Sequence, residues 1–196
     1  MSNNLHHGRH YRGYLPHIDL PAKHYAITYR LADALPSEVL VRLDHEFDAD
    51  DLRRERIDAL MAAGSGACVL KNAENAQTVV DVWRFHAGVR YLIDAWVVMP
   101  NHVHLVIKLC GGAPLEDVVR SWKSFSARAI NRRLGSAGRV WQADYWDRLI
   151  RNEDHYFAAI RYVHENPVRA GLVSVARDWR WSTAREWEER RNAEIR

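Results

Sequence analysis

Two histidines separated by one valine stand in the stretch MPNHVHLVI, which runs from Met99 to Ile107. If this apolar run is a β-strand, His102 and His104 project from the same face, roughly 7 Å apart, because side chains alternate along a strand. Neutral imidazole is a common metal ligand, and two rings on one rigid face can share a cation. A second interpretation, two ordinary hydrogen-bonded histidines at a strand end, stays open at this point.

Two imidazoles do not complete a metal site. Cys68 and Cys110 lie far apart and at no spacing typical of zinc ligands, so we interpret them as reduced thiols of a cytosolic protein. A third ligand therefore has to come from another part of the chain. An oxygen ligand would leave room for water and a phosphate, which suits Mg²⁺ or Mn²⁺.

A tyrosine on the last long helical segment is a candidate nucleophile. The segment NEDHYFAAIRYVHENP predicts a helix over about 153–166, ended by Pro167. One face of this helix forms an apolar stripe of Tyr156, Phe157, Ile160, Val163 and His164. Tyr162 falls about 150° from the centre of that stripe. Asn166, four residues on, neighbours it. Packing for Tyr162 and a helix-end role for Asn166 stay open as alternatives.

The elements that would position these residues follow from apolar periodicity and turn signals. Alternation predicts strands over 24–31, 90–99 and 102–109, the last two forming an antiparallel hairpin around Pro100-Asn101. Helical spacing covers 36–63, where FDADD could break it in two, and also 72–86 and 115–134. Residues 64–66 are a loop, and 140–150 is a short strand or an extended segment. Interspersed helices around an antiparallel sheet indicate an α+β domain.

Composition limits the function classes only broadly. The 196 residues carry 28 Lys and Arg against 25 Asp and Glu, so the net charge of +3 permits a nucleic-acid partner without requiring one. At 47% hydrophobic residues the chain is typical of globular proteins, and no run reaches the length of a membrane span. The polar N-terminal stretch carries no secretion signal, so we expect a cytoplasmic location.

Several segments, taken in order, resemble one family. They are HYAITYR (24–30), AWVVMPNHVHLVI (95–107), SWKSFSARAIN (121–131), VWQADYWDRLIRNEDHY (140–156), YVHENPVRAGLV (162–173) and DWRWSTA (178–184). Together they resemble the REP-associated tyrosine transposases, relatives of the IS200/IS605-type transposases within the single-tyrosine HUH nucleases. The resemblance implies a ferredoxin-like α+β fold, the HUH nuclease fold, with an antiparallel sheet and flanking helices.

The resemblance also implies a mechanism and a partner. His102, His104 and Asn166 would hold Mg²⁺ or Mn²⁺, and Tyr162 would attack DNA to form a 5′-phosphotyrosine and release a 3′-hydroxyl. The implied substrate is single-stranded DNA whose imperfect palindromic repeats fold into hairpins. The expected activity is therefore that of a single-strand DNA endonuclease and strand transferase, as a monomer or a dimer.

The resemblance divides the chain into three parts. Residues 1–22 would be a loose basic arm, 23–187 the transposase domain, and 188–196 a charged tail. Within the domain, 36–86 is a helical extension that departs from the family pattern and has no assigned role.

Basic side chains near these motifs are candidate DNA contacts, because strand binding needs phosphate contacts and stacking surfaces. They are Lys123, Arg120, Arg128, Arg148, Arg151 and Arg169, each of which could instead be ordinary solvated surface. Two rival functions remain. One is a sequence- or hairpin-specific DNA-binding protein of the same fold without transposition activity. The other is a metal oxygenase, which would require a carboxylate ligand and more strands than the sequence contains.

Overall fold

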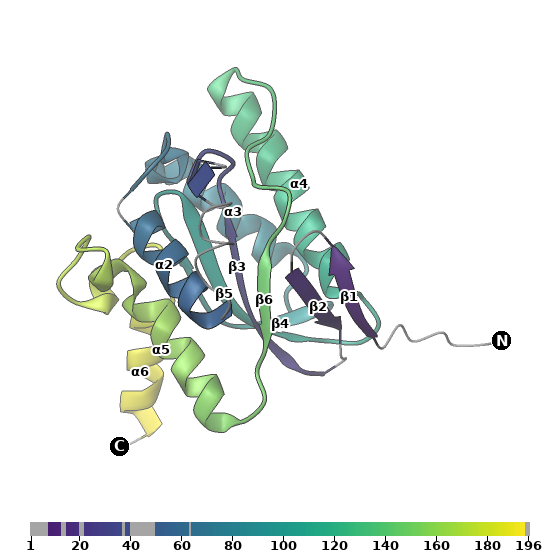
Figure 1. Cartoon of the computed structure of the whole chain (residues 1–196). Helices are drawn as coiled ribbons and strands as arrows, with labels where there is room; N and C mark the ends of the chain where they lie inside the picture. The colour runs from purple at the N-terminus through teal and green to yellow at the C-terminus, as the bar shows by residue number, and fades with distance from the viewer. Residues whose placement is uncertain are drawn as a thin grey trace.

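A computed structural model of the chain describes residues 8–12, 15–19, 22–36, 38–39, 50–62 and 64–194, with side chains within 22–36, 38–39, 56–62 and 64–193 (Figure 1). The elements in chain order are β1 (Gly8–Arg12), β2 (Leu15–Asp19), β3 (His24–Arg30), α2 (Asp50–Ala62), the 3-10 helix η1 (Val69–Lys71), α3 (Ala73–Phe85), β4 (Tyr91–Val98), β5 (His102–Leu109), α4 (Leu115–Leu134), β6 (Trp146–Leu149), α5 (Glu153–Arg169), the 3-10 helix η2 (Ala176–Asp178) and α6 (Ala184–Glu194).

Four strands form the central sheet, in the order β4-β5-β3-β6, and every neighbouring pair is antiparallel. In chain order, β3, α3, β4, β5, α4 and β6 make a β-α-β-β-α-β unit. The two strands of the predicted hairpin, β4 and β5, are neighbours, and the first of the predicted strands, β3, pairs with the other edge of β5. The expected α+β fold of ferredoxin-like type is confirmed.

The sheet buries different side chains on its two faces, because strand residues alternate. Tyr25, Ile27 and Tyr29 of β3 pack toward α3 and α4 in the larger core. Trp83 of α3 donates its indole hydrogen to the Tyr29 hydroxyl at 2.8 Å, and Trp122 of α4 is buried in the same cluster. The opposite face carries a smaller core against α5, so the sheet lies between two helical layers (Figure 1).

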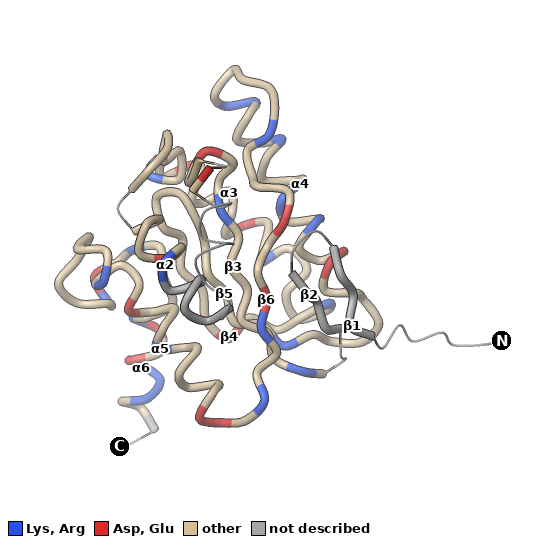
Figure 2. The backbone as a smooth tube through the Cα atoms, viewed as in Figure 1, with Lys and Arg blue, Asp and Glu red and all other residues tan. Residues whose placement is uncertain are grey.

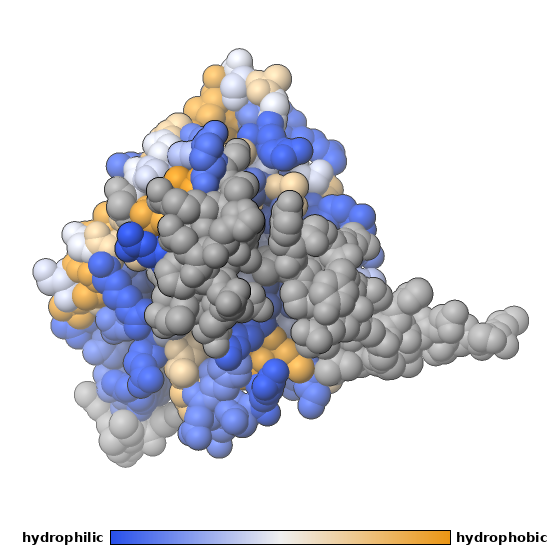
Figure 3. All heavy atoms as spheres, in the orientation of Figure 1, coloured by the Kyte–Doolittle hydropathy of each residue, from blue (hydrophilic) through white to orange (hydrophobic). Residues whose placement is uncertain are grey.

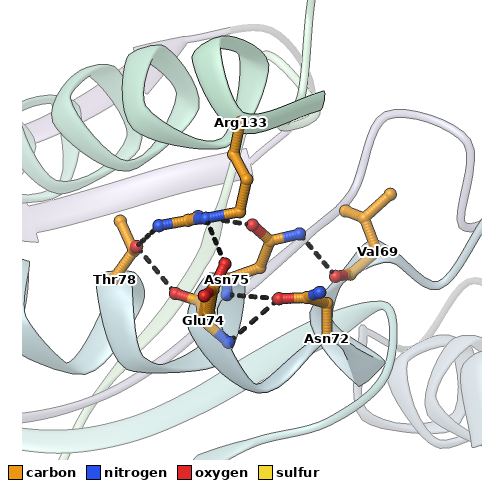
Figure 4. A network of polar contacts seen from close by, with 6 residues as sticks. All are labelled: Val69, Asn72, Glu74, Asn75, Thr78 and Arg133. Carbon is orange, nitrogen blue, oxygen red and sulfur yellow. Dashed lines mark hydrogen bonds and ion pairs between the residues drawn. The ribbon is translucent and has the colours of Figure 1, made fainter. Parts of the chain in front are cut away.

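An arginine fastens the end of α4 to α3 (Figure 4). The Arg133 guanidinium pairs with Glu74 at 2.9 Å and donates to Asn75 at 2.6 Å and Thr78 at 3.3 Å. Asn75 is fully buried and donates in turn to the carbonyl of Val69 at 2.8 Å. Because a buried amide needs its partners, this network fixes the pairing of the two helices that cover one face of the sheet.

The Trp-rich segment 178–184 covers the outer edge of β4. Val98 donates its backbone hydrogen to Trp181 at 2.9 Å, and Thr183 donates to Trp96 at 3.1 Å. The Trp179 indole donates to the Val98 carbonyl at 3.0 Å. An open strand edge invites pairing with other chains, so this segment closes the sheet on that side. Helix α6 follows directly and crosses the boundary predicted at 187/188.

The N-terminal arm differs from its predicted form. Residues 1–22 were expected to be loose, yet β1 and β2 pair as an antiparallel ladder beside β6 (Figure 1). The reason is that ladder hydrogen bonds satisfy the backbone whatever the polarity of the side chains. The polar side chains of this segment therefore gave no strand signal in the sequence.

In the predicted helical run 36–63, residues 38–39 and α2 are helical, while 40–49 lie outside the described residues.

Helix α5 does not end at Pro167, as predicted, but continues to Arg169. Leu172 donates its backbone hydrogen to the Pro167 carbonyl and Gly171 to that of Val168, both at 2.9 Å. Gly171 has φ +67°, so the end is a Schellman motif with glycine in the left-handed conformation. Proline in the last turn removes only one helical hydrogen bond, so the helix continues past it and ends just before Gly171.

The surface of the described chain is mixed in polarity. Figure 3 shows one face that is largely hydrophilic, with small separate hydrophobic areas around the grey atoms. None of the helices within the described ranges has the length and hydrophobicity needed to cross a membrane.

Candidate active site

His102 and His104 lie on the face of the sheet that α5 covers. Both are buried, with 0% and 1% of their surfaces exposed, and their ring centroids are 4.8 Å apart with the planes at 83°. Val106, next on the same face of β5, packs with the α5 residues Ile160 and Val163. The alternation of the strand therefore places both rings together, as expected from the sequence.

Asn101 fixes the orientation of the first histidine. Its side-chain nitrogen donates to two carbonyls, of Met61 at 3.1 Å and Ser65 at 2.9 Å. Its oxygen must then be the atom that faces Nδ1 of His102 at 2.7 Å. Because a carbonyl oxygen only accepts, Nδ1 carries the hydrogen and Nε2 keeps its lone pair. That Nε2 is buried and makes no hydrogen bond to the described residues.

The His102 ring is neutral at physiological pH. Its pKa is lowered to about 3, mainly by burial and in part by the nearby Arg30 cation, while the Asn166 side chain acts in the opposite direction. A neutral imidazole with an oriented lone pair is the form that binds metals.

His104 joins the sheet to the helix. Its Nδ1 lies 2.7 Å from the Thr28 hydroxyl on the neighbouring strand β3. Its ring meets the ring of Tyr162 edge to face, with centroids 5.4 Å apart and planes at 86°. The structure thus brings together the two predicted elements, the His-x-His strand and the tyrosine helix.

Tyr162 does not face away from the packed side of α5, as the helical wheel suggested. It is half-buried beside His104, whereas Phe157, assigned to the buried stripe, is 49% exposed. Ile160, Val163 and His164 are buried as expected. The wheel assumes one buried face, but α5 contacts both the sheet and α2, so Tyr162 has neighbours on a second side.

Asn166 lies one turn further along α5 and is 6% exposed. Its side-chain nitrogen donates to the Tyr162 carbonyl at 3.0 Å, and its side chain influences the pKa of His102. The helix continues past it, so Asn166 does not serve as the helix end. A buried amide beside an imidazole can hold a cation together with it, with the amide oxygen as ligand.

Two further charged groups reach Tyr162. The phenol donates a hydrogen bond to the carboxylate of Asp58, which comes from α2. The Arg169 guanidinium lies over the phenol ring, 5.0 Å from its centroid. The candidate nucleophile is therefore bracketed by an anion at its oxygen and a cation over its ring.

The donor set can be compared with the needs of a metal. Within the described ranges, no group of three or more His, Cys, Asp or Glu side chains is arranged to hold an ion. His102 and His104 with Asn166 supply two imidazoles and one amide oxygen from adjacent elements. The buried, unbonded Nε2 of His102 fits a metal ligand, because an unpaired buried nitrogen is otherwise costly.

The predicted DNA contacts fall into two regions. Arg120 and Arg128 lie on α4, which covers the opposite face of the sheet from the histidines. Arg120 pairs with Asp117, and Arg128 donates to the Ser124 hydroxyl at 2.8 Å. The structure therefore does not bring these two arginines to the histidine face.

Lys123 of α4 is already engaged within the chain. Its ammonium donates to the carbonyls of Ala143 at 2.8 Å and Asp144 at 3.2 Å. Burial lowers the pKa of Lys123 to about 8, against the raising effect of the Asp144 carboxylate. It joins α4 to the segment before β6, and its predicted DNA contact is untested.

Arg148 and Arg151 are exposed around the connection from β6 to α5, where Figure 2 shows basic positions close to the start of the tyrosine helix. Arg169 lies on α5 itself, beside Tyr162. Arg148 and Arg151 precede α5 directly in the chain. These three could meet a strand that reaches the candidate nucleophile.

Sequence reasoning missed Asn101, Thr28 and Asp58. Asn101 stands next to His102, and its place in the tight Pro-Asn connection was the available signal. Thr28 pairs with His104 only through the sheet register, and Asp58 meets Tyr162 across 104 residues. No local pattern could have found the last two.

Comparison with known proteins points to one family. Residues 76–166 match the family described as "Transposase IS200 like". The chain is 33% identical over 91 residues to the REP-associated tyrosine transposase of Escherichia coli K12, covering 46% of this chain and 53% of that protein. The chain thus spans about half the length of this curated relative. The resemblance expected from the sequence motifs is confirmed.

A solved structure shares the fold. The structure of a REP-associated tyrosine transposase bound to a REP hairpin aligns with 90% of this chain and 83% of its own, at 22% identity and a TM-score of 0.54. At this identity the likeness speaks for the fold alone.

Proposed function

We propose that this chain, whose residues 76–166 match the IS200-like transposase family, is a metal-dependent single-strand DNA endonuclease and strand transferase that acts on hairpin-forming repeat DNA. The observation that carries the proposal is the contact between Tyr162 on α5 and His104 on β5, whose ring in turn contacts that of His102. A phenol beside two oriented imidazoles is suited to attack on a phosphodiester.

The proposed metal ligands are His102, His104 and Asn166, with Mg²⁺ or Mn²⁺ as the ion. When bound, the cation would stabilise the negative charge on the scissile phosphate. The chain prepares this site through the tautomer that Asn101 imposes on His102 and through the Thr28 hydroxyl on His104.

Tyr162 supplies the nucleophile. Its phenol oxygen forms a bond to phosphorus as the bond from phosphorus to O3′ breaks, which gives a 5′-phosphotyrosine and a free 3′-hydroxyl. The phosphotyrosine keeps one phosphodiester linkage for each one broken. A 3′-hydroxyl from another end can therefore displace Tyr162 and rejoin the DNA without an external energy source.

The proposed substrate is a single strand that carries a hairpin. Support comes from the match to the E. coli relative and from a fold shared with a relative bound to a REP hairpin. Exposed Arg148, Arg151 and Arg169 would neutralise phosphates of the strand that approaches Tyr162.

The test is covalent capture. The protein is incubated with end-labelled single-stranded hairpin DNA and Mg²⁺ or Mn²⁺, and the products are separated on a denaturing gel. We expect a protein–DNA adduct that Tyr162→Phe and EDTA both abolish. An undiminished adduct in Tyr162→Phe would exclude this nucleophile. Hairpin binding without any adduct would favour a DNA-binding protein of the same fold.

A further inference from the structure

A carboxylate from the helical extension touches the oxygen of the candidate nucleophile. Asp58 lies on α2, within the segment 36–86 that had no assigned role, and outside residues 76–166 that match the IS200-like family. The Tyr162 hydroxyl donates its hydrogen to this carboxylate. The two residues are 104 positions apart, so the contact depends on how α2 packs against α5.

We propose that Asp58 is the general base that takes the phenol proton of Tyr162, an inference that rests on the proposed function. As the phenol oxygen bonds to phosphorus, its proton passes to the Asp58 carboxylate. The O3′ leaves with the electron pair of the broken bond and takes a proton from water. On rejoining, the incoming 3′-hydroxyl loses its proton to water, and protonated Asp58 returns a proton to the departing phenol oxygen.

The other groups described around Tyr162 are less suited to this role. Arg169 lies over the ring and has no acceptor atom. His104 meets the tyrosine through its ring, and as a metal ligand it would have no lone pair to spare. Asn166 is a neutral amide whose nitrogen donates to the backbone of Tyr162. Asp58 combines a negative charge with a direct hydrogen bond at the reacting oxygen, which is the geometry a general base needs.

Helix α2 is tied to the histidines through Asn101, the residue that orients His102. The carbonyl of Met61, one turn after Asp58, accepts a hydrogen bond from Asn101, and Met61 is 1% exposed. Asn101 in turn orients His102. The helix therefore connects to both halves of the site, through Asp58 to the nucleophile and through Met61 to the histidines. This gives the extension a chemical role.

The variants separate base chemistry from packing. Asp58→Asn keeps a side chain of the same shape that still accepts a hydrogen bond from the phenol, but it cannot hold the proton. Asp58→Ala opens space in which added formate can replace the carboxylate, and Asp58→Glu keeps the base. Asp81→Asn removes an exposed carboxylate on α3, across the sheet, and serves as the matched control.

The measurements are single-turnover rates of adduct formation between pH 5.5 and 9, with hairpin and Mn²⁺ binding measured in parallel. We expect Asp58→Asn to slow adduct formation about 10²- to 10³-fold at neutral pH, with a rate that rises tenfold per pH unit, while binding is unchanged. Formate should accelerate Asp58→Ala in proportion to its concentration, and Asp58→Glu should recover part of the rate. Asp81→Asn should match the wild type.

The outcomes distinguish this proposal from the one it rests on. If the wild type forms the adduct, and Asp58→Asn forms it at the same rate and with the same pH profile, Asp58 is not the general base. The proposed transferase function would then still stand. A wild-type protein that forms no adduct would overturn both. A second readout, the pKa of Tyr162 followed by NMR of ¹³C-labelled tyrosine, should fall in Asp58→Asn, because a neutral neighbour opposes phenolate formation less than a carboxylate does. An unchanged value would contradict the contact itself.

Discussion

Tyr162 and His104 meet edge to face with their ring centroids 5.4 Å apart, although one belongs to helix α5 and the other to central strand β5. The contact joins two segments some sixty residues apart in sequence. Its geometry depends on the packing of α5 through Ile160 and Val163 against the sheet.

Asn166 is the first group to test. Replacing it with alanine removes the proposed amide ligand and the hydrogen bond to the Tyr162 carbonyl. We expect Asn166→Ala to weaken Mn²⁺ binding, measured by calorimetry, by at least about tenfold and to slow adduct formation with it. Asn166→Asp, which keeps a ligand oxygen, should bind Mn²⁺ better than Asn166→Ala. Equal Mn²⁺ affinity in Asn166→Ala and the wild type would remove Asn166 from the ligand set.

Asn101 should affect the metal without touching it. In Asn101→Ala the Nδ1 hydrogen of His102 loses its acceptor, so the ring is free to present either nitrogen. We expect Mn²⁺ affinity to fall about 10- to 100-fold, the range found for groups that orient metal ligands. The histidine tautomer can be read from ¹⁵N chemical shifts in the metal-free protein. A mixed tautomer in Asn101→Ala supports the role, and an unchanged Nδ1-protonated ring would contradict it.

Gly66 lies next to Ser65, whose carbonyl helps to hold Asn101. A substitution at Gly66 therefore tests the orientation of His102 indirectly. Gly66 has φ +85°, and a Cβ atom there would lie 2.5 Å from the Asp33 carbonyl oxygen. Gly66→Ala must therefore move the loop whose Ser65 carbonyl accepts from Asn101. We expect a loss of stability of about 1–3 kcal/mol in urea unfolding and weaker Mn²⁺ binding. Gly64→Ala is the control, since φ is also positive but a Cβ meets nothing within 4 Å.

Lys123 separates a structural from a DNA-binding role. Its ammonium donates to two carbonyls, so Lys123→Met should lower the free energy of unfolding by about 1–2 kcal/mol. The salt dependence of hairpin binding should stay as in the wild type. Arg148→Met is the comparison, and its slope of log affinity against log salt should fall by about 0.7. A similar fall of this slope in Lys123→Met would support the phosphate contact that the sequence predicted for Lys123.

Local patterns in the sequence were sufficient for most elements. Alternation located β3, β4 and β5, and the spacing of apolar residues located α3 and α4, because each of these elements buries one regular face. Strand geometry placed His102 and His104 on one face, and the resemblance to the family then implied their metal-binding role. Tyr162 was chosen because it left the buried stripe of α5, although the structure shows that it has its own neighbours there.

Contacts between distant segments could not be read in this way. The Asp58–Tyr162 contact and the docking of 178–184 on β4 depend on where α2 and the C-terminal segment pack, and no periodicity encodes that. The continuation of α5 past Pro167 was missed because proline was given more weight than Gly171, which carries the positive φ.

His164 gives a prediction for the pH dependence of stability. It is buried on α5, and its Nε2 lies 3.0 Å from the Thr183 hydroxyl of the segment that closes the β4 edge. Burial lowers the pKa of His164 to about 4, below its ordinary value of 6.5. The unfolded chain therefore binds a proton at a higher pH than the folded chain does. Between pH 6.5 and 4, acid favours the unfolded state, and above about pH 7 the effect vanishes.

The expected size of this effect is about 3 kcal/mol over that range, since each pKa unit corresponds to about 1.4 kcal/mol. Urea unfolding with EDTA at pH 7.5, 6 and 5 measures the part of this effect above pH 5, about 2 kcal/mol. His102 contributes a pH dependence of the same sign, so the informative quantity is the difference between the wild type and His164→Gln. We expect His164→Gln to lose less stability on acidification than the wild type. An equal loss in both would show that His164 is protonated in the folded state at pH 5, against the effect of its burial.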